Sequence, residues 1–277
     1  MTKPKEIPLS RMRKISDSGV FVKRFGQYGK VAMKPYAHRD DYYIVALITA
    51  GSAAVDVDFE RKELKAGEIL IVSPWQVHGK PQCEEWQSAD GWMLALAPEM
   101  LSDREARMIE EYSVSPHTFS PGERIVEDID SLCSMLERHR GDDNVAGSLA
   151  SAVKSLVLSA IGTSHGETSG RYRAITFRLR KLLDVYIVRE KSPAAYASML
   201  NISEVYLNEA VKSATGLSAG AYIRSRAVVQ AKRELAYTSM SAKEIAYALG
   251  YDDYAYFSKL FKKDTGKSPS EYRRNLK

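Results

Sequence analysis

Polar side chains that can hydrogen-bond to nucleic acid recur at helical spacing near the end of the chain. Ser258, Lys259 and Lys262 fall on one face of a helical pattern, and Phe257 and Phe261 fall on another. Lysine can reach phosphate oxygens or the O6 and N7 atoms of guanine, and serine can bond to several base edges. This polar, basic stripe has the chemistry that a helix reading the DNA major groove needs.

A short helix and a tight turn precede the stripe and would position it. The apolar pattern of Ile245 and Leu249 ends at Gly250, a residue that enters a left-handed turn without Cβ strain. Tyr251 to Tyr254 then form the turn. The run from Ser241 to Arg274 therefore reads as a helix-turn-helix (HTH) whose second helix turns its basic face outward.

The same pattern occurs once more upstream, between Ser192 and Arg224. The two copies are offset by 49 residues before the turn and by 50 after it, an insertion that a surface turn accommodates easily. Two tandem copies are a far more specific signal than one. We call residues 192–216 the first HTH unit and 241–266 the second. The matched pairs include Ala197 with Ala246, Leu200 with Leu249, Asn201 with Gly250, Leu207 with Phe257, Val211 with Phe261 and Gly216 with Gly266.

A continuous helical pattern over residues 219–236 joins the two units. Eighteen residues at 1.5 Å each give about 27 Å. With the width of the flanking units added, the two second helices are expected about one DNA turn apart, roughly 34 Å, on one side of a duplex.

The charge of the chain is unevenly distributed. Residues 171–277 hold 20 Lys and Arg against 10 Asp and Glu, whereas residues 1–170 hold 20 against 25. Basic charge confined to the helical third indicates a polyanion-binding domain attached to a domain with another role. A solvated charged surface is the alternative. The length of 277 residues suits about two domains, and we expect an α+β protein.

Residues 20–98 carry a β pattern. Tyr42 to Thr49, Ala54 to Phe59, Glu68 to Val72 and Gly91 to Ala97 read as short strands separated by turns at Gly51 and Gly67, which favours a sandwich or a small barrel. A barrel of this size can hold one small molecule in its mouth. Plain core packing is the alternative for each candidate lining residue. These candidates are His38, Tyr43, Phe59, Trp75, His78 and Trp92.

The hairpin around Gly51, the strand and turn from Gly67 to Pro74, and His78 just beyond resemble the cupin-like sensor half of many bacterial regulators. Enzymatic cupins would hold a metal through a His-x-His motif, a Glu and a further His. Here the first motif reads His38-Arg39-Asp40, with one histidine where two are expected. We therefore expect no metal and no cofactor, and we expect His38 and His78 to hydrogen-bond locally.

Residues 99–166 change to a helical period. Glu99–Tyr112, Gly122–Arg140 and Val145–Ile161 read as helices, and the last two are too apolar to stand alone. They would pack on the β domain or pair with a second copy of the chain. Residues 163–170 are rich in Gly, Ser and Thr and suit a linker. Residues 1–19 are polar and basic and are expected to form a mobile arm, with a latch as the alternative.

The second HTH unit is the part of the chain that best matches the signature of a known protein family. Residues 175–277 resemble the DNA-binding domain of AraC/XylS-family transcriptional regulators. The resemblance implies a seven-helix domain over residues 171–277, preceded by a sensor in 1–98 and by a dimerisation segment in 99–166. It also implies a homodimer, a small-molecule effector, contact with RNA polymerase and, most often, activation. The matched residues are Ala246, Gly250-Tyr251, Phe257-Ser258, Phe261-Lys262, Gly266, Pro269 and Tyr272-Arg273.

The resemblance also assigns contacts with DNA. Asn208 could pair with adenine, Lys259 with guanine, and Val205 or Ala255 with a thymine methyl. Glu209 departs from the family, which commonly has a basic or neutral polar residue there. Asp252 and Asp253 are placed to cap the second reading helix. The positions expected to meet bases are Val205, Asn208, Glu209, Tyr254, Ala255, Ser258 and Lys259, and those expected to meet phosphates are Lys212, Arg224, Arg226, Lys262, Lys263 and Arg273.

Two further observations bear on the cell compartment and the function class. Cys83 and Cys133 lack paired or metal-ligand spacing, which suits a reducing cytoplasm. No signal peptide is visible, and the uncharged run of Tyr42 to Val55 is too short to span a bilayer, so we expect no membrane association. A metal-dependent cupin enzyme with a DNA-targeting domain is the competing interpretation, and the single histidine in the first motif argues against it.

Overall fold

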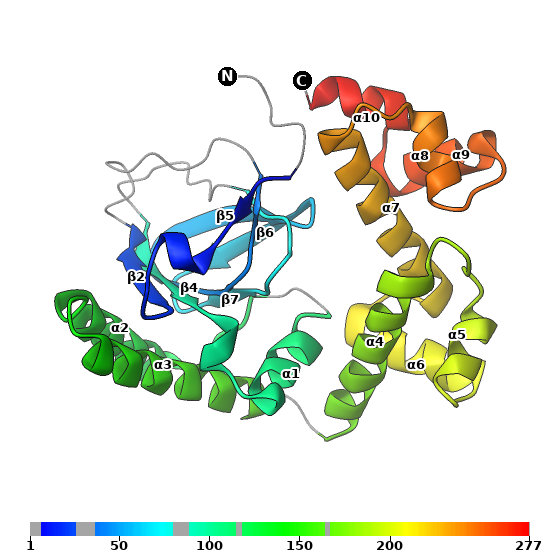
Figure 1. Cartoon of the computed structure of the whole chain (residues 1–277). Helices are drawn as coiled ribbons and strands as arrows, with labels where there is room; N and C mark the ends of the chain where they lie inside the picture. Colours follow the sequence, from blue (N-terminus) through cyan, green and yellow to red (C-terminus); the bar gives the residue numbers. More distant parts are fainter. Residues whose placement is uncertain (1–6, 26–36, 80–88, 115–117, 164–166, 277) are drawn as a thin grey trace. The chain divides into compact units, whose positions relative to one another are not determined.

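The computed structural model describes residues 7–25, 37–79, 89–114, 118–163 and 167–276. They belong to two compact units (Figure 1). The described residues of Pro8–Gly166 combine strands with three α-helices, and we call this part the sheet unit. Glu167–Lys277 is helical, and we call it the helical unit. The chain is therefore an α+β protein with two domains.

The centre of the sheet unit is a four-stranded antiparallel sheet with the order β2-β8-β4-β7. The pairing places Val45 opposite both Ile71 and Leu94, and Ile44 opposite both Val72 and Ala95. Because successive side chains point to opposite faces, these two sets line opposite sides of the sheet. The strands are β2 (Val20–Arg24), β4 (Tyr43–Ala50), β7 (Ile69–Val72) and β8 (Asp90–Leu96).

Each face of the sheet is covered differently. Val45, Leu47 and Leu94 share a core with the helices, whereas Ile44 and Ile48 share a second core with the hairpin of β5 (Ser52–Val57) and β6 (Glu60–Lys65). The hairpin strands pair with each other and not with the central sheet. Within the described ranges the strands thus form separate sheets, and the small barrel that the sequence suggested is not closed.

The N-terminal residues from 7 onward are part of the fold. Strand β1 (Leu9–Ser10) pairs in parallel with β3 (Arg39–Asp40), and a 3-10 helix, η1 (Met12–Lys14), follows it. Met12 is buried, and its N–H donates to Asp41 Oδ1 at 2.7 Å. The expected mobile arm is therefore wrong for residues 7–19, because an apolar side chain and strand pairing anchor this segment. Residues 1–6 lie outside the described ranges.

Helices α2 and α3 run side by side along one face of the sheet (Figure 1). Ala150, Val153 and Val157 of α3 lie in the core, and Trp92 Nε1 of β8 donates to Asp130 Oδ1 of α2 at 2.6 Å. Residues 143–162 are long and apolar enough to cross a membrane, but their inward side packs on the sheet, as in a core helix. The elements after β8 are η3 (Pro98–Met100), α1 (Asp103–Tyr112), α2 (Glu123–Arg138) and α3 (Asp143–Thr163).

The helical unit consists of seven helices between residues 167 and 276. Helix α4 begins at Glu167, inside the segment that composition suggested as a linker. Both HTH units and the connecting helix lie where the periodicity predicts them. The helices are α4 (Glu167–Tyr186), α5 (Pro193–Met199), α6 (Glu204–Thr215), α7 (Ala219–Tyr237), α8 (Ala242–Ala248), α9 (Tyr254–Thr265) and α10 (Pro269–Asn275).

Short polar residues fix where six of these helices begin. In each case a serine or aspartate side chain accepts a hydrogen bond from a backbone N–H of the first turn, which satisfies one of the unpaired donors at a helix start. Asp253 caps α9 in this way, as the sequence predicts, and its carboxylate accepts from Ala255 N at 2.7 Å. The capping residues are Ser192, Ser203, Ser218, Ser241, Asp253 and Ser268.

Helix α7 contributes to two separate cores. Tyr222 and Ile223 near its start pack with α4, α5 and α6, whereas Ala231 and Leu235 near its end pack with α8 and α9. One continuous helix of 19 residues, about 28 Å long, therefore fixes the separation of the two HTH units.

Candidate nucleic-acid interface

The two HTH units have the same turns. Asn201 follows α5 with φ +56°, and Gly250 follows α8 with φ +74°, so both first helices end in the left-handed region. Gly216 and Gly266 end the second helices with φ of +76° and +73°. The repeat seen in the sequence is thus a repeat of backbone conformation.

The turn at Gly250 in the second unit also contacts the loop that leads from α4 into the first unit. A Cβ atom on Gly250 would lie 1.8 Å from the carbonyl oxygen of Val188, so this position requires glycine for space as well as for φ. Lys191 Nζ donates to Gly250 O at 3.1 Å and lies 4.6 Å from the ring centre of Tyr251. The second unit is therefore packed against the loop between α4 and α5, and the separation of the two units does not depend on α7 alone.

Helix α6 presents a mixed outer face. Leu207 and Val211 are completely buried, which leaves the opposite side of the helix to solvent. There Val205 is 71% exposed, and Glu209 and Lys212 are exposed. With Glu204, which is also exposed, α6 therefore offers one apolar side chain, two carboxylates and one ammonium to solvent.

Asn208 has a structural contact that the sequence did not suggest. Its Oδ1 accepts a hydrogen bond at 3.0 Å from the N–H of Ala219, the first residue of α7. The side chain is half-buried, and the bond holds the start of α7 against α6. In this arrangement Asn208 ties the two helices together, which is a different role from the adenine contact expected for it.

Helix α9 presents a more basic face. Phe257 and Phe261 are completely buried in the second core. On the other side Ala255, Lys259, Lys262 and Lys263 are exposed, whereas Tyr254 and Ser258 are half-buried. Three ammonium groups on one 12-residue helix, against one on α6, give the second unit the stronger attraction for phosphate.

Tyr256 is a candidate contact that the sequence did not single out. It is 56% exposed on α9, whereas its counterpart Tyr206 on α6 is half-buried and meets Tyr172 edge-on at 5.8 Å. The two tyrosines are 50 residues apart and so occupy matching positions of the two units, and only the structure distinguishes them.

The arginines expected to hold phosphate have different surroundings. Arg273 is half-buried: its Nε donates to Leu235 O at 3.1 Å, and its Nη1 donates to Met240 O. It therefore caps the C-terminal end of α7. Arg226 lies 3.9 Å from Asp184 of α4, at the limit of an ion pair. Arg224 is exposed, which fits the expected phosphate contact.

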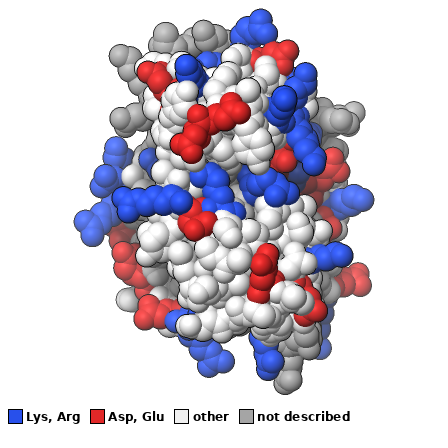
Figure 2. Space-filling model, turned by 90° about the vertical axis from the view of Figure 1, so that its right-hand side faces the viewer, with Lys and Arg blue, Asp and Glu red and all other residues white. Residues whose placement is uncertain are grey.

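On the face of the molecule that Figure 2 draws, charged residues are unevenly distributed. Figure 2 shows Lys and Arg in several groups, with Asp and Glu among them and wide uncharged areas between. On the face that Figure 2 shows, the basic residues therefore do not form one continuous surface. Recognition would rest on individual side chains of the reading helices more than on a uniform field.

The six candidate ligand residues of the sheet unit do not form one group. Tyr43 and Trp92 lie in the core beneath the helices, and burial raises the pKa of Tyr43 to about 12. Trp75 is 54% exposed, and Phe59 is half-buried in a turn with φ +65°. His38 and His78 meet elsewhere, with ring centres 4.5 Å apart.

Comparison with known proteins adds independent information. Residues 196–275 match a protein-family model described as a helix-turn-helix domain. The uncharacterized HTH-type transcriptional regulator YijO of Escherichia coli is 30% identical over 130 residues, which cover 47% of this chain and 44% of that protein. The match thus spans less than half of that relative.

Two further similarities extend over most of the chain. The HTH-type transcriptional activator RhaS of Salmonella paratyphi A is 21% identical over 246 residues, which cover 85% of this chain and 86% of that protein. The crystal structure of apo ToxT K231A from Vibrio cholerae is 15% identical with a TM-score of 0.44, and it covers 94% of this chain and 98% of that one.

Proposed function

Because the chain belongs to the AraC/XylS family of helix-turn-helix transcriptional regulators, we propose that it binds specific promoter DNA through both HTH units at once. The observation that carries the proposal is the pair of exposed faces on α6 and α9, held apart by one helix and by the packing of Gly250 on Val188. With helices of this length the two faces suit successive major grooves, about 34 Å apart. Transcription regulators, and not enzymes, make up the family.

We assign unequal roles to the two units. Lys259, Lys262 and Lys263 make α9 the larger source of affinity, because each neutralised phosphate releases counterions. Helix α6, with Val205 and Glu209 outermost, contributes more of the selectivity, since a carboxylate accepts from cytosine N4 but is repelled by phosphate. Ser258 and Ala255 of α9 add base contacts.

The contacts described above change two of the expected roles. Asn208 and Arg273 each bond to backbone atoms of the α7 region, so we assign them to positioning of the helices. Lys212, Arg224 and Arg226 remain the phosphate contacts that accompany the lysines of α9.

The sheet unit is the proposed sensor for a small-molecule effector. The sheet unit is a separate domain with two apolar cores, and contact between the HTH units and DNA does not require it. The name of RhaS describes that protein as an activator, and activation through contact with RNA polymerase is the mode that we propose here. The regulator would act in the cytoplasm. A thermal-shift screen of sugars, aromatic acids and other metabolites tests the sensor role, because a ligand that binds the folded state raises the melting temperature.

Helices α2 and α3 are the proposed dimer contact. An open groove of about 530 Å³ lies between them, lined in part by Leu132, Ala152 and Leu156, and Met135, also on α2, is 41% exposed. Apolar side chains that stay in water on one chain favour burial against a second copy. Light scattering should give the mass of a dimer for the wild-type chain and of a monomer for Leu156→Lys.

DNA binding itself is tested with the full-length chain and a random duplex library. After several rounds of selection we expect an enriched sequence that binds at least about 1,000-fold more tightly than scrambled duplex at moderate salt. Enrichment of no sequence, with equal affinity for selected and scrambled duplexes, would reject specific DNA binding.

A further inference from the structure

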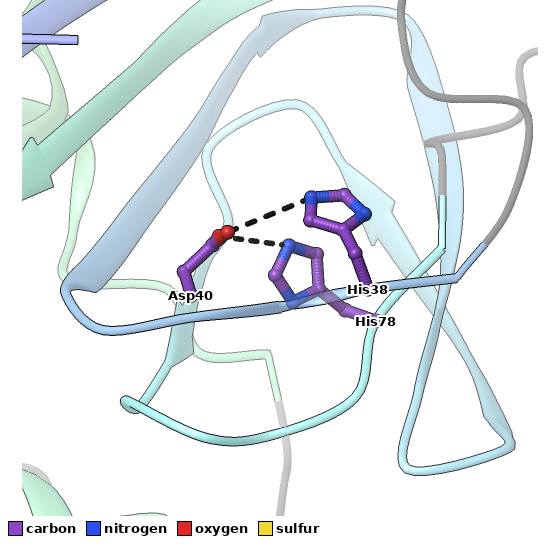
Figure 3. Close-up of side chains that lie close together, drawn as sticks. All are labelled: His38, Asp40 and His78. Atoms are coloured by element: carbon purple, nitrogen blue, oxygen red, sulfur yellow. Dashed lines mark ion pairs between the residues drawn. The ribbon is translucent and has the colours of Figure 1, made fainter. Parts of the chain in front are cut away.

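Three side chains of the sheet unit converge within a few ångströms. A ligand atom from each of His38, Asp40 and His78 lies within 4.8 Å of the others. His78 Nε2 is 3.1 Å from Asp40 Oδ2, and His38 Nε2 is 3.6 Å from Asp40 Oδ1 (Figure 3). The carboxylate thus faces both imidazole rings.

Strand geometry explains why these residues meet. His38 and Asp40 are two positions apart, so their side chains leave the same face of the chain. His78 lies directly opposite His38 in an antiparallel bridge: His38 N donates to His78 O at 3.0 Å, and His78 N donates to His38 O at 2.9 Å. Backbone pairing therefore holds the three side chains on one side, and Asp40 is fixed in turn by the pairing of β3 with β1.

The environment suits a bound cation. Asp40 is 3% exposed and His78 is 6% exposed, and a buried carboxylate requires a compensating positive charge. His78 Nδ1 lies 3.3 Å from Gln76 O. A neutral imidazole that donates from Nδ1 to this carbonyl presents the lone pair of Nε2 to the space before Asp40, the arrangement common for a metal-bound histidine.

The two distances to Asp40 are compatible with a shared metal ion as well as with direct ion pairs. Ligand atoms about 2.0–2.2 Å from one ion lie about 3–3.5 Å from each other. The two Asp40 contacts, at 3.1 and 3.6 Å, already lie close to that spacing. The side chain of His38 keeps 16% of its surface exposed, which leaves a way in for an ion and its remaining water ligands.

We propose that His38, Asp40 and His78 bind one divalent transition-metal ion, of the class that takes mixed imidazole and carboxylate ligands, such as Zn²⁺ or Fe²⁺. Mg²⁺ is excluded from this class, because it prefers oxygen ligands alone. The ion would join the strand β3 to the segment before residue 79 and would stabilise the sheet unit. The His-x-His pattern does not reveal this site, because Asp40 occupies the position where that pattern has its second histidine.

The test uses the full-length chain, freed of metal with a chelator, and Zn²⁺ as the probe. Isothermal titration should give one saturable Zn²⁺ site, with a rise in melting temperature, and no comparable response to Mg²⁺. His38→Gln and Asp40→Asn should each weaken Zn²⁺ binding by at least about 10-fold. His139→Gln is the matched control, because His139 is exposed at the end of α2 and should leave binding unchanged.

The variants also separate a metal site from a simple ion pair. Far-ultraviolet circular dichroism checks that His38→Gln, the more accessible of the two changes, is folded. Co²⁺ bound at the same site should give visible absorption bands that disappear in this variant. The proposal is overturned if the wild-type chain shows no saturable Zn²⁺ binding, or if His38→Gln and Asp40→Asn bind Zn²⁺ as tightly as His139→Gln.

Discussion

The packing of Gly250 leads to a quantitative prediction about stability. Replacing Gly250 with alanine puts a Cβ on a residue with φ +74°, which costs about 1 kcal/mol of backbone strain. The new atom would also lie 1.8 Å from Val188 O and 2.9 Å from Val188 C. Because these are backbone atoms, the turn itself must move, at a further cost of about 1–3 kcal/mol.

Gly266→Ala is the matched control. Gly266 has nearly the same φ, +73°, but a Cβ there meets nothing within 4 Å. We therefore expect about 1 kcal/mol of destabilisation for Gly266→Ala and about 2–4 kcal/mol for Gly250→Ala. Part of the difference reflects the contacts of Lys191 with Gly250 O and with the Tyr251 ring, which the displaced turn would lose.

Urea unfolding followed by two signals measures this difference. All three tryptophans precede residue 100, so tryptophan fluorescence reports on the sheet unit, whereas helical circular dichroism also reports on the helical unit. With a slope of about 2 kcal/mol/M, the helical midpoint should fall by about 1–2 M for Gly250→Ala and by about 0.5 M for Gly266→Ala. Equal shifts for the two variants would refute the close packing of the second HTH unit on the loop between α4 and α5.

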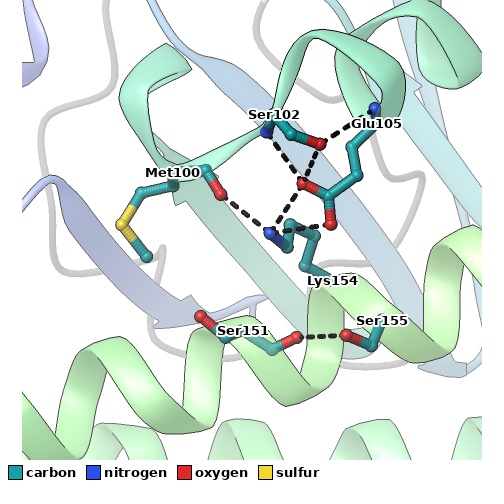
Figure 4. Close-up of polar contacts among 6 residues, drawn as sticks. All are labelled: Met100, Ser102, Glu105, Ser151, Lys154 and Ser155. Atoms are coloured by element: carbon teal, nitrogen blue, oxygen red, sulfur yellow. Dashed lines mark hydrogen bonds and ion pairs between the residues drawn. The ribbon is translucent and has the colours of Figure 1, made fainter.

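Three further changes test other parts of the structure. Lys262→Ala should weaken binding to every DNA sequence and reduce the slope of log K against log salt by about 0.9 in a titration over a salt series. The control Lys65→Ala, an exposed lysine of the sheet unit, should change neither the affinity nor the slope. Arg273→Met should lower the free energy of unfolding of the helical unit by about 2 kcal/mol, because the hydrogen bonds to Leu235 O and Met240 O are lost. Arg274→Met, at the exposed neighbouring position, should change this free energy by no more than about 0.5 kcal/mol, and urea unfolding measures both values. Glu105 accepts from Ser102 N and pairs with Lys154, which also donates to Met100 O (Figure 4). These contacts, the Ser102 backbone first, lower the pKa of Glu105 from 4.5 to about 2. The folded state thus favours the ionised form, and its contribution to stability is present above pH 4.5 and is lost as the pH falls toward 2. Acid titrations of Glu105→Gln should therefore show a smaller loss of stability over that window than the wild-type chain, and an equal loss would contradict the assignment.

Local signals made most of the helical unit predictable. The left-handed glycines, the apolar spacing of α5 to α9 and the capping aspartate of α9 depend on neighbours in the chain, so sequence patterns record them. What they do not record is contact between distant segments. The bond from Asn208 to Ala219, the bonds of Arg273 and the approach of Gly250 to Val188 each join groups that only the folded chain brings together.

The sheet unit was harder to predict, for a physical reason. Strand β6 reads ERKELK and has low strand propensity, but it forms by pairing with β5 in a two-stranded sheet, and edge strands tolerate charged residues. The cluster of His38, Asp40 and His78 depends on a cross-strand register that periodicity cannot supply. Of the two cysteines, Cys83 lies outside the described residues, whereas Cys133 is buried and free.

The central claim is that both HTH units read one duplex from the same side, and half-site phasing tests it most directly. On the selected site, insertion of about five base pairs between the two contacted blocks turns one block by half a helical turn. Since α7 and the Gly250 contact fix the separation of the reading helices, anisotropy titration should then show affinity reduced to that of a site with one block alone. Unchanged affinity after the insertion would contradict the account.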